Sequence, residues 1–295
     1  MAWRVLNVAQ PSKLSLKDGQ LFYQPSNKDE EILMFSLEDI AVLILEHHGI
    51  IITNALLAAL AENGITVFSC DSSHIPNGVY MPFFKHSRYS QMAWQQIQIS
   101  AAFKKRLWQK IVKAKIVNQA EVLRKYNKPE YKILAQMVNK VVSGDTGNIE
   151  SIAAREYWNV LFIDFNRNKD CIQNAALNYG YAILRGCVAR FIVGAGLIPA
   201  FGVHHANQLN SYNLADDLIE PFRAFIDYLV LRMDLNKETL VPSDKHYLIG
   251  ILTHNCSFNK QIITVLNACE FAAMSLAKSI RTKNPEDLLL PSFSD

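Results

Sequence analysis

Cysteine is scarce in this 295-residue sequence, and the motifs in which cysteines bind zinc or form redox pairs are absent. The five cysteines are odd in number and widely scattered, and no two of them form a C-x-x-C pair. This usage argues against a disulfide scaffold and against a zinc ribbon. It is typical of reduced thiols in a cytosol.

Long apolar runs and phosphate-binding loops are also missing. The most apolar stretch, residues 179–203, is interrupted by Arg185 and Arg190, so it is not an uncharged segment of membrane-spanning length. The first ten residues lack the basic and apolar regions of a secretory signal, and we expect a cytoplasmic protein with no membrane partner. The sequence contains neither a P-loop nor a G-x-S-x-G motif, which argues against nucleotide-driven steps and serine acyl transfer.

Positive charge is concentrated in the middle of the chain. Residues 81–140 contain 13 Lys and Arg against two acids, whereas the remaining residues contain 17 basic and 25 acidic side chains. Such an uneven distribution indicates a polyanionic partner, and a solubilising helix face is the alternative. The cations that we expect to contact DNA phosphates are Lys85, Arg88, Lys104, Lys105, Arg106, Lys110 and Lys113.

Two regions with different apolar periodicity divide the chain. Residues 1–75 contain short apolar strands separated by turn residues, and they predict a β-rich domain with one short helix. Prolines and an Asn-Gly pair in residues 70–82 indicate a linker. Residues 76–295 show helical spacing and predict an all-α domain, so we expect an α+β protein.

The helical domain is expected to contain several long helices and to end in a loosely ordered tail. Asn148 is a plausible cap for one helix, and Pro221 is expected to kink another so that Glu220 points inward. The predicted helices cover residues 91–117, 131–142, 150–162, 170–195, 213–232 and 254–278.

Residues 196–223, GLIPAFGVHHANQLNSYNLADDLIEPFR, collect side chains that can bind a metal. On a helix, Asp216 and Asp217 share a face with Glu220, which follows them by four and three residues. Carboxylates beside an imidazole suit a hard divalent cation. The alternative is a hydrogen-bonded core histidine next to a solvated acidic helix face.

Three separated pieces of the sequence, NIESIAAREYW, GLIPAFGVHH and NLADDLIEPFR, occur in an order and at distances that resemble the CRISPR-associated adaptation integrases. These proteins are metal-dependent nucleases that insert foreign DNA fragments into a CRISPR array. The similarity extends weakly over the whole chain, including the N-terminal WRVLNVAQPSKLSLKDGQL. It is strongest to members from systems whose interference nuclease is a single RNA-guided protein.

This resemblance implies that Glu150, His205 and Glu220 are the catalytic metal ligands. His205 is preferred to His204 because of its distance from Gly196 in the family pattern. His204 is then either a DNA phosphate contact or an ordinary surface residue. With two carboxylates, one imidazole and no thiolate nearby, we expect Mg²⁺ or Mn²⁺ as the cofactor and not structural zinc.

The resemblance also implies an auxiliary or outer-shell role for Asp217, and pairing of Arg223 with a carboxylate of the site or with DNA. The sequence departs from the family pattern at Glu220, where relatives carry Asp, at Ser151, where many have Gly, and at Ile198, where many have Asp. Glu220 keeps the carboxylate of Asp on a longer side chain, so this departure leaves only the exact position of the metal open.

The function implied by the resemblance is integration of short double-stranded DNA with free 3′ ends into CRISPR repeat DNA. The 3′-hydroxyl of the fragment would attack a phosphodiester at the repeat edge, with the cation stabilising the charge that develops. The family also implies a homodimer formed through the β-rich domain and a complex with a small ferredoxin-like CRISPR-associated partner. Two alternatives stay open: a metal-dependent nuclease that acts on branched DNA in repair, and a non-catalytic DNA-binding scaffold.

Overall fold

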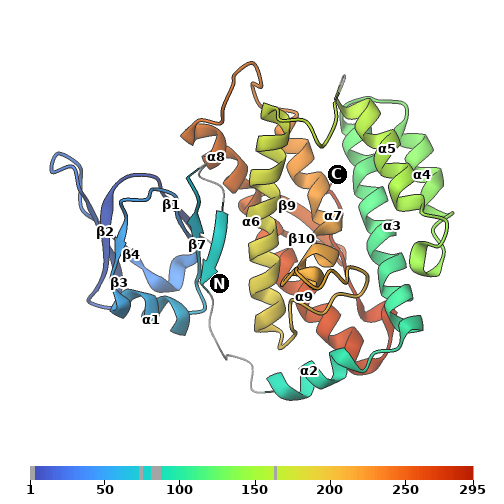
Figure 1. Ribbon diagram of the computed structural model, residues 1–295, viewed down its shortest axis with the longest axis horizontal. Coiled ribbons are helices and arrows are strands. Elements are labelled where there is room, and N and C mark those ends of the chain that lie inside the picture. Colours follow the sequence, from blue (N-terminus) through green and yellow to red (C-terminus); the bar gives the residue numbers. More distant parts are fainter. Residues whose placement is uncertain (1–3, 73–75, 81–87, 163–164, 295) are drawn as a thin grey trace. The chain divides into compact units, whose positions relative to one another are not determined.

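The computed structural model describes residues 4–72, 76–80, 88–162 and 165–294, in two compact units, Met1–Lys85 and His86–Asp295. The N-terminal unit is rich in strands, and the C-terminal unit is mostly helical (Figure 1). The expected α+β architecture is therefore confirmed. Among the described residues, no helix is both long and apolar enough to cross a membrane.

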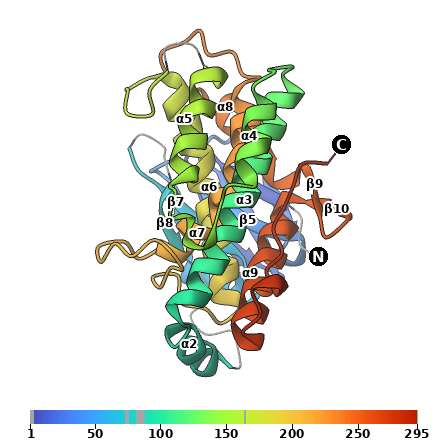
Figure 2. The same cartoon turned by 90° about the vertical axis from the view of Figure 1, so that its right-hand side faces the viewer.

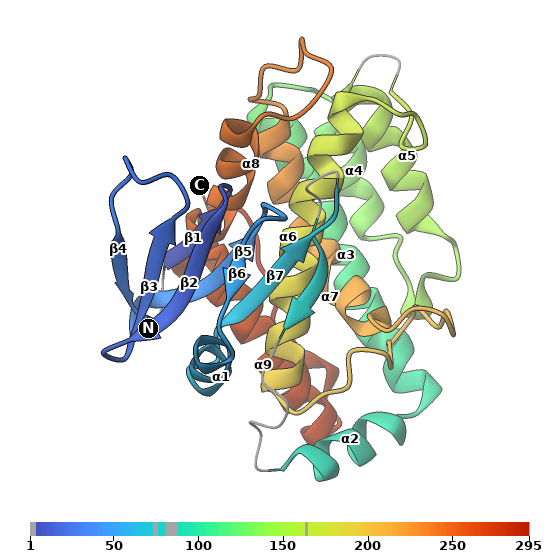
Figure 3. The ribbon, with the colours of Figure 1, turned by 60° about the vertical axis from the view of Figure 1, so that its left-hand side comes forward.

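The N-terminal unit is built from two four-stranded sheets, which are visible in Figure 3. The first sheet has the strand order β1 (Arg4–Val8), β5 (Ile40–Leu45), β7 (Thr66–Cys70) and β8 (Pro76–Tyr80). The second has the order β4 (Leu33–Ser36), β3 (Gln20–Pro25), β2 (Ser12–Lys17) and β6 (Ile51–Ile52). Asp18 and Gly19 both have positive φ, 51° and 73°, and form the hairpin turn between β2 and β3.

Helix α1 (Asn54–Glu62) lies between β6 and β7 in the chain. The Oγ1 of Thr53 accepts a hydrogen bond from the backbone N–H of Leu56 at 3.4 Å, and the helix ends at Asn63. Leu56 and Leu60 are fully buried in the core of this unit. The apolar face of the helix therefore supplies part of the core that stabilises the two sheets.

The predicted linker is wrong for residues 76–80. Despite Pro76 and Gly78, this segment forms β8 and pairs antiparallel with β7. Pro76 is the first residue of an edge strand, where the missing N–H interrupts no ladder within the sheet. This strand belongs to the N-terminal unit, as does Cys70, the last residue of β7. Residues 73–75, 81 and 82 of the predicted linker lie outside the described residues.

The C-terminal unit contains helices that pack side by side (Figure 2). Helix α7 contacts both α3 and α6, and most of its side chains are buried. The helices are α2 (Tyr89–Ile97), α3 (Ala101–Lys125), α4 (Tyr131–Val138), α5 (Ile149–Leu161), α6 (Ile172–Gly194), α7 (Asn213–Val230), α8 (Pro242–Ile249) and α9 (Val265–Thr282).

Two of the helix predictions are wrong in detail. The predicted helix over residues 91–117 is divided into α2 and α3, because Ser100 adopts an extended conformation and its Oγ accepts from the N–H of Phe103 at 3.2 Å. The predicted helix over residues 254–278 begins only at Val265, after a hairpin of β9 (Asn255–Phe258) and β10 (Gln261–Thr264). The helical unit is therefore not purely α-helical.

The C-terminal tail is packed against the helices, in contrast to the expected loose end. Leu288 is buried, and the ring of Phe293 stacks on Phe225 with centroids 4.2 Å apart. The Nδ2 of Asn118 on α3 donates to the carbonyl of Pro291 at 3.1 Å. Apolar burial and backbone hydrogen bonds therefore hold the tail in place, despite its prolines and serines.

Candidate active site

Lys115 on α3 lies between two carboxylates that come from different helices. Its Nζ is 2.5 Å from Oε1 of Glu150 on α5 and 2.6 Å from Oε2 of Glu220 on α7. Because one nitrogen touches both oxygens, those oxygens are at most 5.1 Å apart, the sum of the two distances. Two bonds of about 2.0–2.6 Å from a divalent ion to oxygen can bridge that gap. The donor set of these two residues therefore fits a hard cation.

Glu150 owes its position to the start of α5. The carboxylate of Asp145 accepts hydrogen bonds from the backbone N–H groups of Ile149 and Glu150, at 3.0 and 2.9 Å. Asn148, the predicted cap, makes no side-chain capping bond and has a φ of 49°. Asp145 therefore performs that role, and the negative side chain of Glu150 lies in the first turn, where the helix dipole favours it.

Glu220 is buried and bound by two cations. Arg223 Nε donates to its Oε1 at 2.9 Å, while Lys115 contacts its Oε2. Burial by itself would raise the pKa of Glu220, but the charges of Lys115 and Arg223 outweigh it and lower the pKa to about 2. Glu220 is therefore an anion at neutral pH. Helix α7 continues through Pro221, and the Glu220 side chain points into the unit.

Asp217 holds the segment that carries the two histidines. Its Oδ2 accepts from the N–H groups of Val203 and His204 at 2.6 and 3.1 Å. Its Oδ1 accepts from the N–H of His205 at 3.1 Å and lies 2.7 Å from Nδ1 of the same residue. Asp217 has no exposed surface, so the alternative of a solvated acidic face is wrong for Asp217 and for Glu220.

The contact with Asp217 determines which nitrogen of His205 is available to a ligand. The hydrogen bond that Asp217 accepts from the imidazole raises the pKa of His205, burial opposes this, and the fields of Asp217 and Glu220 add to the increase. Because Nδ1 is engaged, Nε2 remains to bind a metal or a phosphate oxygen. A carboxylate behind an imidazole in this way orients the ring and increases its basicity as a ligand.

Three further side chains position the same loop, Gln96, Trp108 and Asn213, and sequence reasoning missed all three. Gln96 Nε2 donates to the carbonyls of Ile198 and Phe201 at 3.0 and 2.8 Å, and its Oε1 accepts from Ile198 N–H at 2.8 Å. Trp108 stacks on the His204 ring with centroids 4.0 Å apart and planes within 3°. The third, Asn213, donates to backbone carbonyls of the loop.

The predicted ligands do not all meet at one point. Across the described ranges, no three His, Cys, Asp or Glu side chains converge closely enough to hold one ion. Glu150 and Glu220 meet at Lys115, whereas His205 turns its Nδ1 to Asp217. The field of Glu220 nevertheless reaches His205 and contributes to its raised pKa. A three-ligand site therefore requires rotation of side chains around Lys115.

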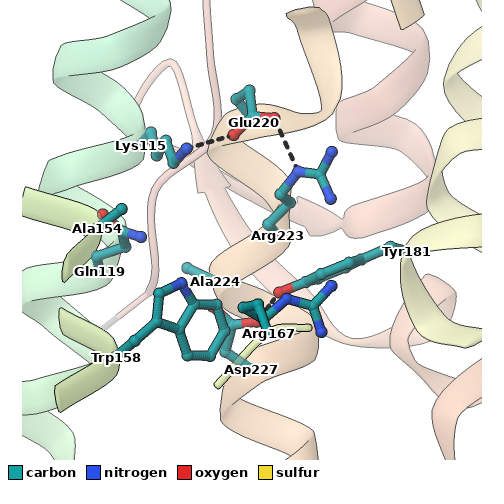
Figure 4. Close-up of a pocket in the computed structure, with 10 residues that line it drawn as sticks. All are labelled: Lys115, Gln119, Ala154, Trp158, Arg167, Tyr181, Glu220, Arg223, Ala224 and Asp227. Carbon is teal, nitrogen blue, oxygen red and sulfur yellow. Dashed lines mark hydrogen bonds and ion pairs between the residues drawn. The ribbon is translucent and has the colours of Figure 1, made fainter. Parts of the chain in front are cut away.

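Lys115 and Glu220 also border a cavity of about 180 Å³ (Figure 4). Its wall includes the guanidinium groups of Arg167 and Arg223 and the ring of Trp158. At the base, the buried carboxylate of Asp227 accepts hydrogen bonds from the hydroxyls of Tyr157, at 2.9 Å, and Tyr181. Burial raises the pKa of Asp227 to about 6, although both hydroxyls oppose that increase. The two arginines and Lys115 make the cavity suited to an anion.

The cations predicted to contact DNA point in several directions. Lys104 Nζ donates to the carbonyl of Gly202 at 3.4 Å, and Lys110 forms an ion pair with Glu286 at 2.9 Å. Arg106 lines a cavity with Arg281. Lys105 is exposed, and Lys113 is half-buried. Arg88 borders a cavity of about 850 Å³, and His204 is stacked on Trp108. Lys85 lies outside the described residues.

The sequence and the fold both have counterparts among known proteins. A "CRISPR-associated endonuclease Cas1" from Neisseria meningitidis serogroup C (strain 8013) is 40% identical over 298 residues, covering 99% of this chain and 97% of that relative. A solved structure described as "Casposase bound to integration product" has a TM-score of 0.77 at 18% identity, over 96% of this chain and 91% of that one.

A second solved structure, described as a "Cas6-RT-Cas1--Cas2 complex", has a TM-score of 0.72 at 19% identity and covers 97% of this chain and 36% of that one. At such identities the two solved structures establish the fold. The family model described as "CRISPR associated protein Cas1" matches residues 6–266. With most of its length matched and a relative at 40% identity, the chain belongs to the Cas1 family of CRISPR-associated proteins.

Proposed function

We propose that this chain is a metal-dependent DNA integrase of CRISPR adaptation, which joins short double-stranded DNA fragments to CRISPR repeat DNA. The observation that most supports this is the convergence of Glu150 and Glu220 on a single positive charge. The Nδ1 of His205 contacts the buried Asp217, and the charge of Glu220 contributes to the raised pKa of His205. Membership of a family whose named relatives are endonucleases supports phosphodiester chemistry.

In this proposal Glu150, Glu220 and the Nε2 of His205 hold Mg²⁺ or Mn²⁺. A divalent cation at this position would stabilise the charge that develops on phosphate oxygens during 3′-hydroxyl attack or hydrolysis. Carboxylates suit both ions, and the imidazole is accepted more readily by Mn²⁺. Asp217 keeps the His205 ring oriented, and Arg223 keeps Glu220 ionised.

The side chains around the cavity supply the remaining interactions. Arg223 and Arg167 present guanidinium groups to the same space as Glu220, and guanidinium groups bind phosphate oxygens strongly. We propose that a phosphate of the DNA strand being joined lies against them. The exposed cations Lys105 and Arg106 on α3 would contact more distant phosphates without reading sequence.

We also propose a homodimer formed through the N-terminal unit, and a larger complex with a small ferredoxin-like CRISPR-associated partner. Strand β4 is at the edge of its sheet, and Leu33 and Met34 on it are 42% and 44% exposed, as is the adjacent Ile32 at 55%. Exposed apolar side chains on an edge strand are typical of an association surface. The description of one similar structure names Cas2 beside Cas1, which supports the partner.

An integration assay tests the function directly. Purified protein, with and without the proposed partner, is incubated with a fragment bearing free 3′ ends and a supercoiled plasmid bearing a CRISPR repeat, in Mg²⁺, Mn²⁺ or chelator. Joined product that requires the divalent ion supports the integrase. Cleavage without joining would instead indicate a plain nuclease, and DNA retention without either would indicate a scaffold. Glu150→Gln serves as the inactive control.

A further inference from the structure

We propose that the side chain of Lys115 competes with the catalytic cation for the carboxylates of Glu150 and Glu220. Its ammonium group holds Glu150 and Glu220 together, and a divalent ion binds the two carboxylates by displacing it. This inference rests on the proposed function, because it assumes that those carboxylates are metal ligands. It assigns to Lys115 the role of a positioning residue that sets the concentration of divalent ion at which the site becomes competent.

The contacts of Lys115 make it unlike the other cations of α3. Its side chain is 11% exposed, and its Nζ touches two carboxylates at 2.5 and 2.6 Å. Burying an ammonium group is costly unless it is paired, so this position is stable only while the carboxylates accept the charge. The carboxylates of Glu150 and Glu220 compensate the buried charge of the Lys115 ammonium group through these two contacts.

A divalent ion and this ammonium group cannot occupy the site together. An ion bonded to both Glu150 Oε1 and Glu220 Oε2 would use the same two oxygen atoms that Nζ now contacts at 2.5 and 2.6 Å, and would lie within a few ångströms of the ammonium group. At such a separation the repulsion between the two cations is large in a partly buried site. Binding of the ion therefore requires the ammonium group to move.

The surroundings allow Lys115 to move while Arg223 stays. Lysine has a flexible four-carbon stem, and Lys115 borders the 180 Å³ cavity, which gives its ammonium group room. Arg223 is held by Oε1 of Glu220 at 2.9 Å and by the Tyr181 ring, whose centroid is 4.7 Å from its guanidinium carbon. Glu220 therefore keeps one counter-charge when the lysine leaves.

Competition of this kind weakens the apparent metal affinity by the fraction of molecules in which the carboxylates are free of the lysine. If the ammonium group is bound in nine molecules of ten, its removal tightens the apparent Kd by about tenfold. If Lys115 had only a structural role, its removal would change the apparent Kd in the opposite direction. Removing it would then loosen the site and weaken metal binding.

The test measures Mn²⁺ binding by isothermal titration calorimetry without DNA, on the full chain and on Lys115→Met. We expect the Kd for Mn²⁺ to become about tenfold tighter or more in Lys115→Met. Lys113→Met, a change of the same chemistry on the same helix, should leave the Kd unchanged. Lys115→Arg keeps the charge and should show no tightening, which guards against an effect of packing. In chelator, Lys115→Met should melt at a lower temperature, because two carboxylates lose their shared counter-charge.

Two further variants separate this inference from the proposed function. If Glu150→Gln and Glu220→Gln each abolish Mn²⁺ binding while folded Lys115→Met binds with unchanged or weaker affinity, the competition by Lys115 is refuted and the metal site stands. If Mn²⁺ binds equally well to Glu150→Gln and Glu220→Gln, the metal site lies elsewhere, and both the proposed function and the role of Lys115 are refuted.

Discussion

The Nδ1 of His205 lies 2.7 Å from the Oδ1 of Asp217, a carboxylate that has no exposed surface. The same carboxylate accepts the backbone N–H groups of Val203, His204 and His205. One buried side chain on α7 therefore fixes both the position of the loop and the orientation of the imidazole. The imidazole that we propose as a metal ligand and the carboxylate that orients it lie on separate segments, and they can be tested separately.

Replacement of the imidazole tests the proposed metal ligand His205. We expect His205→Ala to lower strand joining by about 10²–10³-fold, the scale observed when one charge-stabilising group is removed. Duplex binding should be nearly unchanged, because it depends on many phosphate contacts. Joining rates and a binding isotherm at one salt concentration measure the two effects. Joining at the wild-type rate would make His205 a structural histidine.

Replacement of Asp217, the carboxylate that orients His205, should affect both DNA joining and stability. Asp217→Asn removes the charge and leaves one amide oxygen where two carboxylate oxygens accept four contacts, so buried N–H groups lose acceptors. Stability should fall by about 1–3 kcal/mol. Metal affinity or joining should fall by about 10–100-fold. Asp216→Asn is a matched control, since Asp216 pairs instead with Arg185 at 2.6 Å; equal effects of the two would contradict the assignment.

The stability of the helical unit should depend on pH through Asp227. Its folded-state pKa of about 6 is above the ordinary value of 3.8, so between these values the folded state binds more protons than the unfolded state. The stabilising contribution is therefore full below pH 3.8 and is lost as the pH rises through 6. Relative to Asp227→Asn, unfolding free energies should fall by up to about 1.4 kcal/mol per pH unit in this window. If the curves of unfolding free energy against pH ran parallel for the wild type and Asp227→Asn, this prediction would be refuted.

Salt dependence tests the predicted DNA contacts on α3. Lys105 and Arg106 are both exposed, whereas Lys110 is already paired with Glu286. Replacing Lys105 and Arg106 with Ala should flatten the slope of log K against log salt by about two units, without changing sequence preference. Fluorescence anisotropy with a labelled duplex at several salt concentrations measures the slope. An unchanged slope would mean that these cations face another ligand.

Much of this architecture was determined by local sequence patterns. The hairpin at Asp18-Gly19 needs residues that tolerate positive φ, and the start of α1 at Thr53 needs a short polar side chain, so neighbouring residues alone specify both. The division into a strand-rich and a helical unit followed from apolar periodicity in the same way. The local pattern failed at residues 255–264, where Asn259 and Lys260, both with positive φ, turn a hairpin inside an apparently helical stretch.

The candidate ligands were found by spacing within one stretch and by family resemblance, but their supports were not. Gln96 reaches Ile198 and Phe201 across more than 100 residues, and a glutamine in a polar helix carries no signal of such a contact. Lys115 resembles the other lysines of a basic helix in the sequence. Only the packing of α3 against α5 and α7 distinguishes Lys115 from the other lysines. Charge pairing in a buried site depends on the distances between side chains of three helices, and the neighbours of Lys115 in the chain do not determine those distances.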